Sequence, residues 1–288
     1  MPLWTPTKQW AQVLKQTGEG VTYERIPVPK PATDEVLVHI QFTGFCHTDM
    51  NAFNGDLPIS TKLPLVAGHE GLGIVVACGA KVKDPKEGAR VGIMWINRTC
   101  LTCAFCLGGE ERLCEQAKFT GYTVDGTFQR ATSIVKSLSG DRAGAYDAAE
   151  YAVVQAAHAV DIPGDVPFEK IAPLLCAGLT AYRAIKDCGA RKGNIIAVVG
   201  AGGGVGSMAL QFAKLKGFRT IAIDTGEQKK KLCQKYGASV FIDFATCEDV
   251  IHAVRSETDD GLGAHAVILA ADRQEPIQQA TEVMISFK

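Results

Sequence analysis

The chain contains Ile195-Ile-Ala-Val-Val-Gly-Ala-Gly-Gly-Gly-Val-Gly206, in which five apolar residues run directly into a cluster of glycines. The apolar run has the length of a buried strand, and Val205 to Gly217 then shows the period of a helix. Glycines at such a turn let the backbone approach a pyrophosphate, which the N–H groups of the helix start can bind. We therefore predict a dinucleotide-binding turn made of Gly200, Gly202, Gly203, Gly204, Val205 and Gly206.

The chain beyond this turn continues to alternate between strand and helix. We expect strands at 219–223, 239–242 and 265–270 and a basic helix at 227–236. This alternation predicts a doubly wound parallel sheet, a Rossmann-like α/β domain.

The second predicted strand ends at an acidic residue, Asp224. An acid in this place accepts hydrogen bonds from the adenosine ribose hydroxyls and repels a 2′-phosphate, so we predict NAD rather than NADP. The alternative for Asp224 is a solvated acid in a turn. Lys229 lies either beside the same ribose or on the surface as an ordinary lysine.

The first half of the chain is rich in short apolar runs broken by glycine and proline. The runs 35–42, 73–77 and 90–95 predict strands of an antiparallel, barrel-like domain. We expect the two domains to occupy residues 1–170 and 171–288.

Four cysteines, Cys100, Cys103, Cys106 and Cys114, lie close together in this first half. Such spacing lets a short loop wrap four thiolates around one tetrahedral Zn²⁺. A disulfide framework is the competing interpretation. We favour zinc because the chain is long and its N-terminus does not resemble a secretory leader. The sequence thus predicts a structural zinc lobe at 96–116.

Composition restricts the partners of the protein. The 288 residues carry a formal net charge of −1, and the charged residues are scattered, so we expect neither nucleic acid nor a membrane as a partner. The uncharged stretch 193–213 is long enough to span a bilayer, but its glycines favour a strand–turn–helix. Ten cysteines fit a reducing compartment, and we predict the cytoplasm.

Several motifs occur in a familiar order: Cys46-His47-Thr48-Asp49, Gly68-His69-Glu70-Gly71, the four-cysteine lobe, Leu175-Cys176-Ala177-Gly178 and the glycine turn. The chain resembles the medium-chain zinc-dependent alcohol dehydrogenases, most closely their fungal primary-alcohol branch. The resemblance implies a GroES-like catalytic domain followed by the Rossmann domain. It also implies reversible hydride transfer between a small primary alcohol and NAD⁺, with two zinc ions per chain.

The resemblance assigns roles to individual residues. It implies a catalytic zinc held by Cys46, His69 and Cys176, with Glu70 as an acid that can move onto the metal. Asp49 would orient His69, Thr48 would relay the alcohol proton, and His47 would meet the pyrophosphate.

Two residues depart from the pattern of the branch. Asn51 stands where a histidine usually ends the proton relay, and an imidazole can pass on a proton where an amide cannot. Trp95 matches one of two usual pocket tryptophans, but Leu57 replaces the other. The smaller side chain predicts room for longer or branched primary alcohols.

The chain itself also departs from the family. Residues 130–149 have no counterpart that we recognise, and the sequence stops short of the last two strands of a six-stranded nucleotide-binding sheet. We expect a gene-model artefact or a splice variant. The family forms homo-oligomers, and the strand that would build the dimer is among those missing.

Two alternatives to an active enzyme remain open at this point. One is a folded but catalytically inactive protein that binds zinc and NAD. The other is a zinc-free quinone reductase of the same superfamily, which would not need two thiolate ligands, His69 and the cysteine lobe.

Overall fold

The computed structural model describes residues 5–128, 151–271 and 274–284. The predicted insertion at 130–149 lies outside the described residues. The chain packs as two compact units, Met1–Cys176 and Ala177–Lys288.

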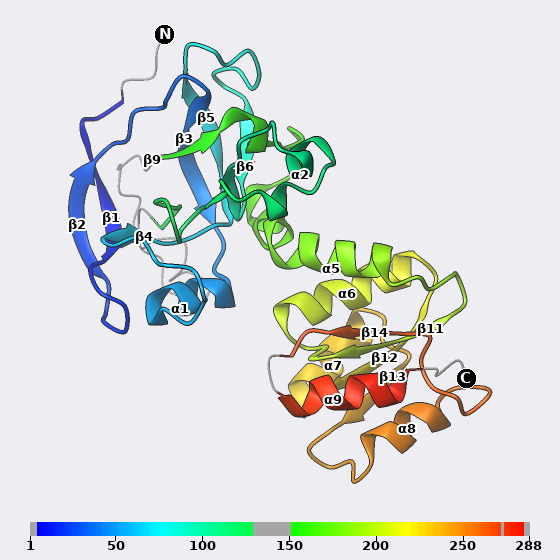
Figure 1. The fold of residues 1–288 in the computed structure, drawn as a ribbon. Coiled ribbons are helices and arrows are strands. Elements are labelled where there is room, and N and C mark those ends of the chain that lie inside the picture. The colour runs from blue at the N-terminus through cyan, green and yellow to red at the C-terminus, as the bar shows by residue number, and fades with distance from the viewer. Residues whose placement is uncertain (1–4, 129–150, 272–273, 285–288) are drawn as a thin grey trace. The chain divides into compact units, whose positions relative to one another are not determined.

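The first unit is built mainly from strands (Figure 1). These are β1 (Lys8–Leu14), β2 (Thr22–Pro27), β3 (Glu35–Thr43), β4 (Leu65–Val66), β5 (Gly71–Cys78), β6 (Arg90–Ile93), β7 (Ile96–Arg98), β8 (Lys118–Phe119), β9 (Tyr151–Gln155) and β10 (Val160–Asp161). Short helical elements connect them: α1 (His47–Asn54), α2 (Ala104–Leu107), η1 (Glu111–Leu113), η2 (Ala156–His158), α4 (Phe168–Ile171) and η3 (Ala172–Leu175).

Two antiparallel sheets form the body of this unit. The larger sheet has the order β10-β6-β5-β3-β9, and the smaller has the order β2-β1-β4. Alternate residues of the central strands, among them Val36, Val38 and Val75, are fully buried and form one core. Leu37 and Val76 at the intervening positions are buried in a second cluster, so both faces of these strands are covered here. The strands predicted at 35–42, 73–77 and 90–95 correspond to β3, β5 and β6.

A separate two-stranded ribbon of β7 and β8 carries the four-cysteine lobe. Ile96 pairs with Phe119 and Arg98 pairs with Lys118, so the ribbon brings the two ends of the lobe together. Helix α2 and turn η1 lie between these two strands along the chain.

The second unit alternates helix and strand. Its elements are α5 (Ala177–Asp187), β11 (Ile195–Val199), α6 (Gly204–Leu215), β12 (Arg219–Asp224), α7 (Glu227–Lys235), β13 (Val240–Asp243), α8 (Val250–Ser256), β14 (Ala266–Leu269) and α9 (Gln274–Val283). The strands are parallel in the order β13-β12-β11-β14. This is the doubly wound sheet that the alternation predicts.

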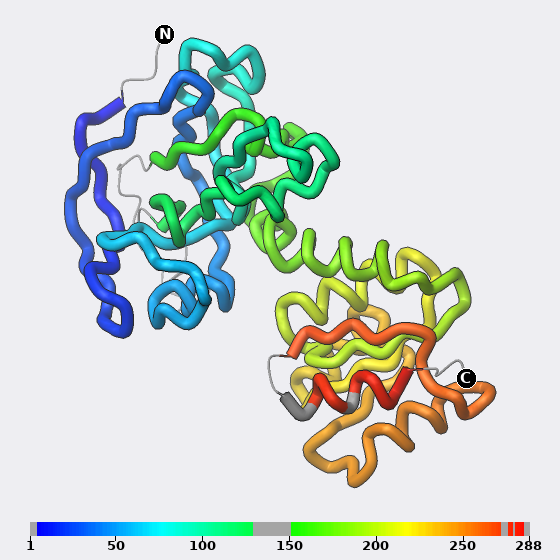
Figure 2. The backbone as a smooth tube through the Cα atoms, viewed as in Figure 1, coloured from blue at the N-terminus to red at the C-terminus, as the bar shows by residue number. Residues whose placement is uncertain are grey.

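Helices cover both faces of this parallel sheet (Figure 2). Ile196 and Val198 of β11 pack with residues of α5 and α6 on one face. Ile195 and Ala197 point to the other face and pack with α8. A strand buried on both sides explains why 195–199 is continuously apolar rather than alternating. Among the described residues, no helix is long and apolar enough to cross a membrane.

Candidate active site and metal centres

Three predicted ligands from distant parts of the sequence meet in the first unit. The ligand atoms of Cys46, His69, Glu70 and Cys176 all lie within 4.8 Å of one another. The Sγ atoms of Cys46 and Cys176 are 3.6 Å apart, and His69 Nε2 is 3.3 Å from Cys176 Sγ. The structure therefore brings together all three residues assigned to a catalytic zinc, with Glu70 beside them.

The position of Cys46 is fixed by the start of helix α1. Cys46 is the extended residue before the helix, and its backbone N–H donates to Asp49 Oδ2 at 2.9 Å. This contact is half of a capping box, which satisfies an N–H group that the helix cannot bond itself. Cys46 Sγ also lies 3.7 Å from Thr48 Oγ1, which places the Thr48 hydroxyl at the cluster.

The same carboxylate orients the histidine. Asp49 Oδ1 lies 2.9 Å from His69 Nδ1, and both side chains are only 1% exposed. The backbone N–H of Gly68 also donates to Asp49 Oδ1, at 3.2 Å. A bond at Nδ1 fixes the ring so that Nε2 faces the two thiols, which is the arrangement of a carboxylate–histidine–metal triad.

Proton affinities in the cluster are strongly perturbed. The hydrogen bond from Cys176 lowers the pKa of Cys46 to about 3, and the same contact together with burial raises the pKa of Cys176. Burial opposes protonation of His69, yet its bond to Asp49 and its contact with Cys46 raise its pKa to about 10. Burial and the negative charge of Cys46 raise the pKa of Glu70 to about 7.

This donor set fits a zinc ion. Two sulfurs and one imidazole are soft and borderline ligands, and three protein ligands leave a fourth position open for a reacting molecule. Four ionisable side chains share this buried volume. A bound divalent cation would take the place of their protons and balance their negative charge. Glu70 offers an oxygen to the same volume.

Gly44 gives Glu70 the room that it occupies. A Cβ atom on Gly44 would overlap the Glu70 carboxylate, and the Gly44 N–H donates to the Glu70 carbonyl at 3.0 Å. Spacing of motifs gives no hint of Gly44, because its role depends on a contact across two loops.

An aromatic cluster lies next to the histidine. The Trp95 ring is 5.3 Å from the His69 ring, edge to face, and it stacks on Phe119 at 5.0 Å. Tyr122 is fully buried, lies 5.8 Å from Trp95, and donates its hydroxyl to the Leu57 carbonyl at 3.5 Å. The two predicted pocket residues, Leu57 and Trp95, thus pack in one cluster with Phe119 and Tyr122, which sequence reasoning did not identify.

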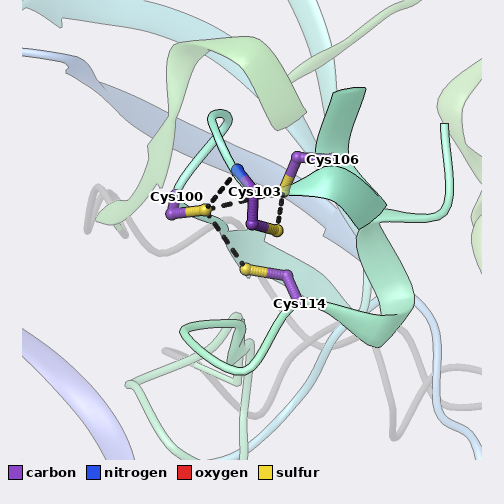
Figure 3. Close-up of side chains that lie close together, drawn as sticks. All are labelled: Cys100, Cys103, Cys106 and Cys114. Carbon is purple, nitrogen blue, oxygen red and sulfur yellow. Dashed lines mark hydrogen bonds between the residues drawn. The ribbon is translucent and has the colours of Figure 1, made fainter. Parts of the chain in front are cut away.

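The four cysteines of the lobe turn their sulfurs toward one another (Figure 3). Cys100 Sγ lies 3.9 Å from Cys106 Sγ and 3.7 Å from Cys114 Sγ, and Cys103 Sγ lies 3.5 Å from Cys106 Sγ. N–H groups of Thr102 and Cys103 lower the pKa of Cys100 to about 6. All ten cysteines of the chain are described and are free thiols, so no disulfide forms. Four converging thiols fit tetrahedral zinc.

The glycine turn in the second unit has the geometry that close backbone packing demands. Gly200 has φ +73°, and a Cβ on Gly206 would overlap the Gly200 carbonyl. Gly203 precedes α6 as its N-terminal capping residue, so Gly202, Gly204 and Val205 lie around the helix start.

Asp224 lies at the end of β12 beside this turn. It is 3% exposed and accepts from the Gly202 N–H at 2.8 Å. Lys229 Nζ donates to Asp224 Oδ1 at 2.7 Å. The lysine is therefore a partner of the acid. His47, the other residue assigned to the cofactor, is exposed on α1 of the first unit.

Family models of known proteins match two parts of the chain. Residues 32–164 match the family model of the alcohol dehydrogenase GroES-like domain, and residues 204–285 match that of zinc-binding dehydrogenases. The chain is 46% identical over 281 residues to alcohol dehydrogenase 1 of Neurospora crassa, which covers 98% of this chain and 74% of the relative. It is 43% identical to an alcohol dehydrogenase of Schizosaccharomyces pombe, over 96% of this chain and 73% of the relative.

Solved structures show the same likeness. A crystal structure of an NAD-dependent alcohol dehydrogenase has a TM-score of 0.81 and 29% identity, over 96% of this chain and 74% of that chain. These findings confirm the predicted fold class and the use of zinc and NAD, and they contradict the zinc-free alternative.

Proposed function

Since the chain belongs to the medium-chain zinc-dependent alcohol dehydrogenases of the fungal type, we propose that the cluster of Cys46, His69 and Cys176 is where it oxidises small primary alcohols with NAD⁺. The reaction runs in both directions, and the reverse direction reduces the aldehyde. The observation that carries the proposal is the convergence of two thiols and a carboxylate-held imidazole within 4.8 Å beside Trp95.

We assign two kinds of role to the residues of the cluster, metal ligand and positioning residue. Cys46, His69 and Cys176 would hold the catalytic zinc, and the four-cysteine lobe a structural one. When bound, zinc supplies Lewis-acid polarisation of the alcohol oxygen and NAD⁺ accepts the hydride. Asp49 keeps the His69 ring in its orientation through the bond at Nδ1.

We assign the transfer of the alcohol proton to Thr48, two residues after the proposed ligand Cys46. Thr48 Oγ1 lies 3.7 Å from Cys46 Sγ, so its hydroxyl would be the first group to take the alcohol proton. In the cofactor domain, Asp224 would accept from the adenosine ribose hydroxyls, with Lys229 beside it.

The side chain at position 57 is our reason to expect alcohols larger than ethanol. Leu57 is held by Tyr122 and packs in the cluster that contains Trp95. The family resemblance implies a tryptophan at this position, and the smaller leucine would leave space for further methylenes, each contributing about 0.8 kcal/mol on burial. We place the enzyme in the cytoplasm, where ten free cysteines stay reduced.

A turnover assay on purified protein tests the proposal. NADH formation is followed with ethanol, butanol and cinnamyl alcohol, and zinc is measured in the same sample. We expect turnover in the unmodified protein and its loss in Cys46→Ser. Cys78→Ser is the matched control, because Cys78 lies outside both cysteine clusters. Zinc in both clusters without NADH formation from any alcohol would overturn the proposal.

A further inference from the structure

Three consecutive residues that precede Cys100 are each bound to the body of the first unit by side-chain hydrogen bonds. Asn97 Nδ2 donates to the Val153 carbonyl at 2.9 Å. Arg98 Nη2 donates to Asp34 at 2.7 Å and to Glu35 at 3.0 Å.

Thr99 is bound twice and is 2% exposed. Its N–H donates to Gln155 Oε1 at 3.0 Å, and its Oγ1 lies 2.9 Å from His158 Nε2. The residue next to the first ligand of the lobe is therefore held through both its backbone and its side chain.

Gln155 is the centre of these contacts. Its Oε1 accepts from Thr99, while its Nε2 donates to Asp34 Oδ2 at 2.9 Å, so both ends of its amide are used. The side chain is buried at 5% exposure. Asp34 in turn receives Arg98 on its other oxygen, which lowers the pKa of Asp34. Removal of the amide would leave a buried N–H and a carboxylate oxygen without these partners, which is costly.

The lobe beyond Cys100 is held by a different kind of contact. Leu107 N–H donates to the Cys103 carbonyl, and Cys114 N–H donates to the Glu111 carbonyl, so α2 and η1 are organised by the lobe's own backbone. The return strand β8 pairs with β7, and its Phe119 stacks on Trp95. The contacts around Gln155 thus connect Thr99, next to the cysteine lobe, to the end of β9 and to Asp34 just before β3.

We propose that Gln155 is a positioning residue for the four-cysteine zinc site, which holds Cys100 in the geometry that retains the metal. The proposal rests on the assignment of zinc to that site under the proposed function. Removal of a group that orients a metal ligand from outside the coordination sphere typically changes metal affinity about 10- to 100-fold. We expect a change of about this size when the Gln155 amide is removed.

The test is zinc release from the full-length holoenzyme of Gln155→Leu into excess chromogenic chelator. Release from the four-cysteine site is identified in a Cys46→Ser background, in which the catalytic ligand set is incomplete. We expect Gln155→Leu to speed release from the four-cysteine site by about tenfold or more. In the protein that keeps Cys46, we expect the rate of zinc release from the catalytic site to stay unchanged.

Gln9→Leu is the matched control. Gln9 is also a buried glutamine that uses both ends of its amide, but it bonds the backbone of Tyr151 at the opposite end of β9. A general loss of stability would affect both variants alike. A specific acceleration in Gln155→Leu alone supports the proposal.

A second variant protects the test against misfolding. Asp34→Ala changes a partly exposed residue and removes the oxygen that accepts from Gln155 Nε2, and we expect the same release phase to accelerate. Release at the unmodified rate in both variants, or equal acceleration by Gln9→Leu, would overturn the proposal. Absence of zinc from the lobe of the unmodified protein would overturn the structural-zinc assignment with it, whereas loss of alcohol turnover alone would count only against the proposed function.

Discussion

Gly44 shows how a residue without a side chain shapes the cluster that contains Cys46 and Glu70. A Cβ at this position would overlap the Glu70 carboxylate. We expect Gly44→Ala to displace Glu70 or the backbone leading to Cys46, and to lower turnover by about 10- to 100-fold. Turnover and zinc content measure the effect. Gly20→Ala is the control, since Gly20 has nothing near its missing Cβ and keeps an ordinary φ; equal effects of the two substitutions would contradict our account.

Leu57 provides a prediction about substrate size. Leu57→Trp puts a larger side chain into the cluster that contains Trp95, and should shift the preference from butanol toward ethanol. Loss of room for two methylenes corresponds to about 1.6 kcal/mol, roughly a tenfold change in the ratio of kcat/KM values. Ile59→Val, in the same loop but partly exposed, should leave the ratio unchanged. A preference for ethanol already present in the unmodified protein would refute the assignment of Leu57.

Asn51 bears on the pH dependence of turnover. An amide cannot pass on a proton as an imidazole does, so loss of the alcohol proton should limit turnover below neutral pH. We expect Asn51→His to raise kcat in that range with little effect at alkaline pH. An unchanged pH–rate profile would show that the relay does not pass through this position.

The predicted site residues divide into those that motifs can identify and those that only contacts reveal. Cys46, His69 and Cys176 were assigned through the resemblance, and the structure gathers them. Their roles in catalysis stay predictions. Tyr122 and Gln155 carry no motif, because a buried tyrosine or glutamine acquires its role from partners far along the chain.

Strand β3 contains a histidine whose burial affects stability. Burial lowers the pKa of His39, which lies 5.3 Å from the Tyr151 ring. The unfolded chain therefore takes up a proton first as the pH falls below about 6.5, and stability is lost as the pH falls further toward the folded pKa. His39→Gln should flatten this loss in Tm measured from about pH 7 to pH 5. The exposed His252→Gln on α8 is the control, and parallel profiles for all three proteins would contradict the prediction.

Helix α6 carries much of the core of the second unit. Leu210 is fully buried against the sheet, whereas Leu215 on the same helix is 83% exposed. We expect Leu210→Ala to lower the free energy of unfolding by about 2–5 kcal/mol and Leu215→Ala by much less. Urea unfolding measures both, and similar midpoints for the two variants would be inconsistent with the described packing.

Elements with a strong hydrophobic period were predictable, and those stabilised by context were not. The predicted helix 205–217 corresponds to α6, and strands 219–223 and 239–242 correspond to β12 and β13. Strand β2 was missed because none of its residues is buried, so its sequence lacks the alternation that marks a strand. Helix α5 was not predicted either, although its buried residues lie on one side.

At the scale of the whole molecule, the ligand clusters and the cofactor turn lie in different units. Removal of both metals by a chelator should therefore abolish alcohol turnover while NADH still binds to the second unit. Fluorescence titration with NADH measures that binding, and Asp224→Leu should weaken it with or without metal. Loss of NADH binding on metal removal alone would show that the cofactor site depends on the zinc clusters.

The order of the second unit's elements was predictable because each βα unit is local in sequence. Parallel pairing of β11 with β12 and β14 follows from that alternation. The domain ranges 1–170 and 171–288 stay a prediction; the compact units place η3 and Cys176 with the first part of the chain. Long-range pairings such as β9 with β3 have no local signal, since they join segments that are far apart in sequence.

Cys176 is the last residue of the first compact unit, and no ligand of either cluster comes after it. A ribosome therefore completes both of these clusters before it begins the nucleotide-binding half. N-terminal domains generally fold first during synthesis. The nascent chain can thus bind both metal ions while the remainder is still being translated. Zinc can therefore affect folding at a stage when the NAD site does not yet exist.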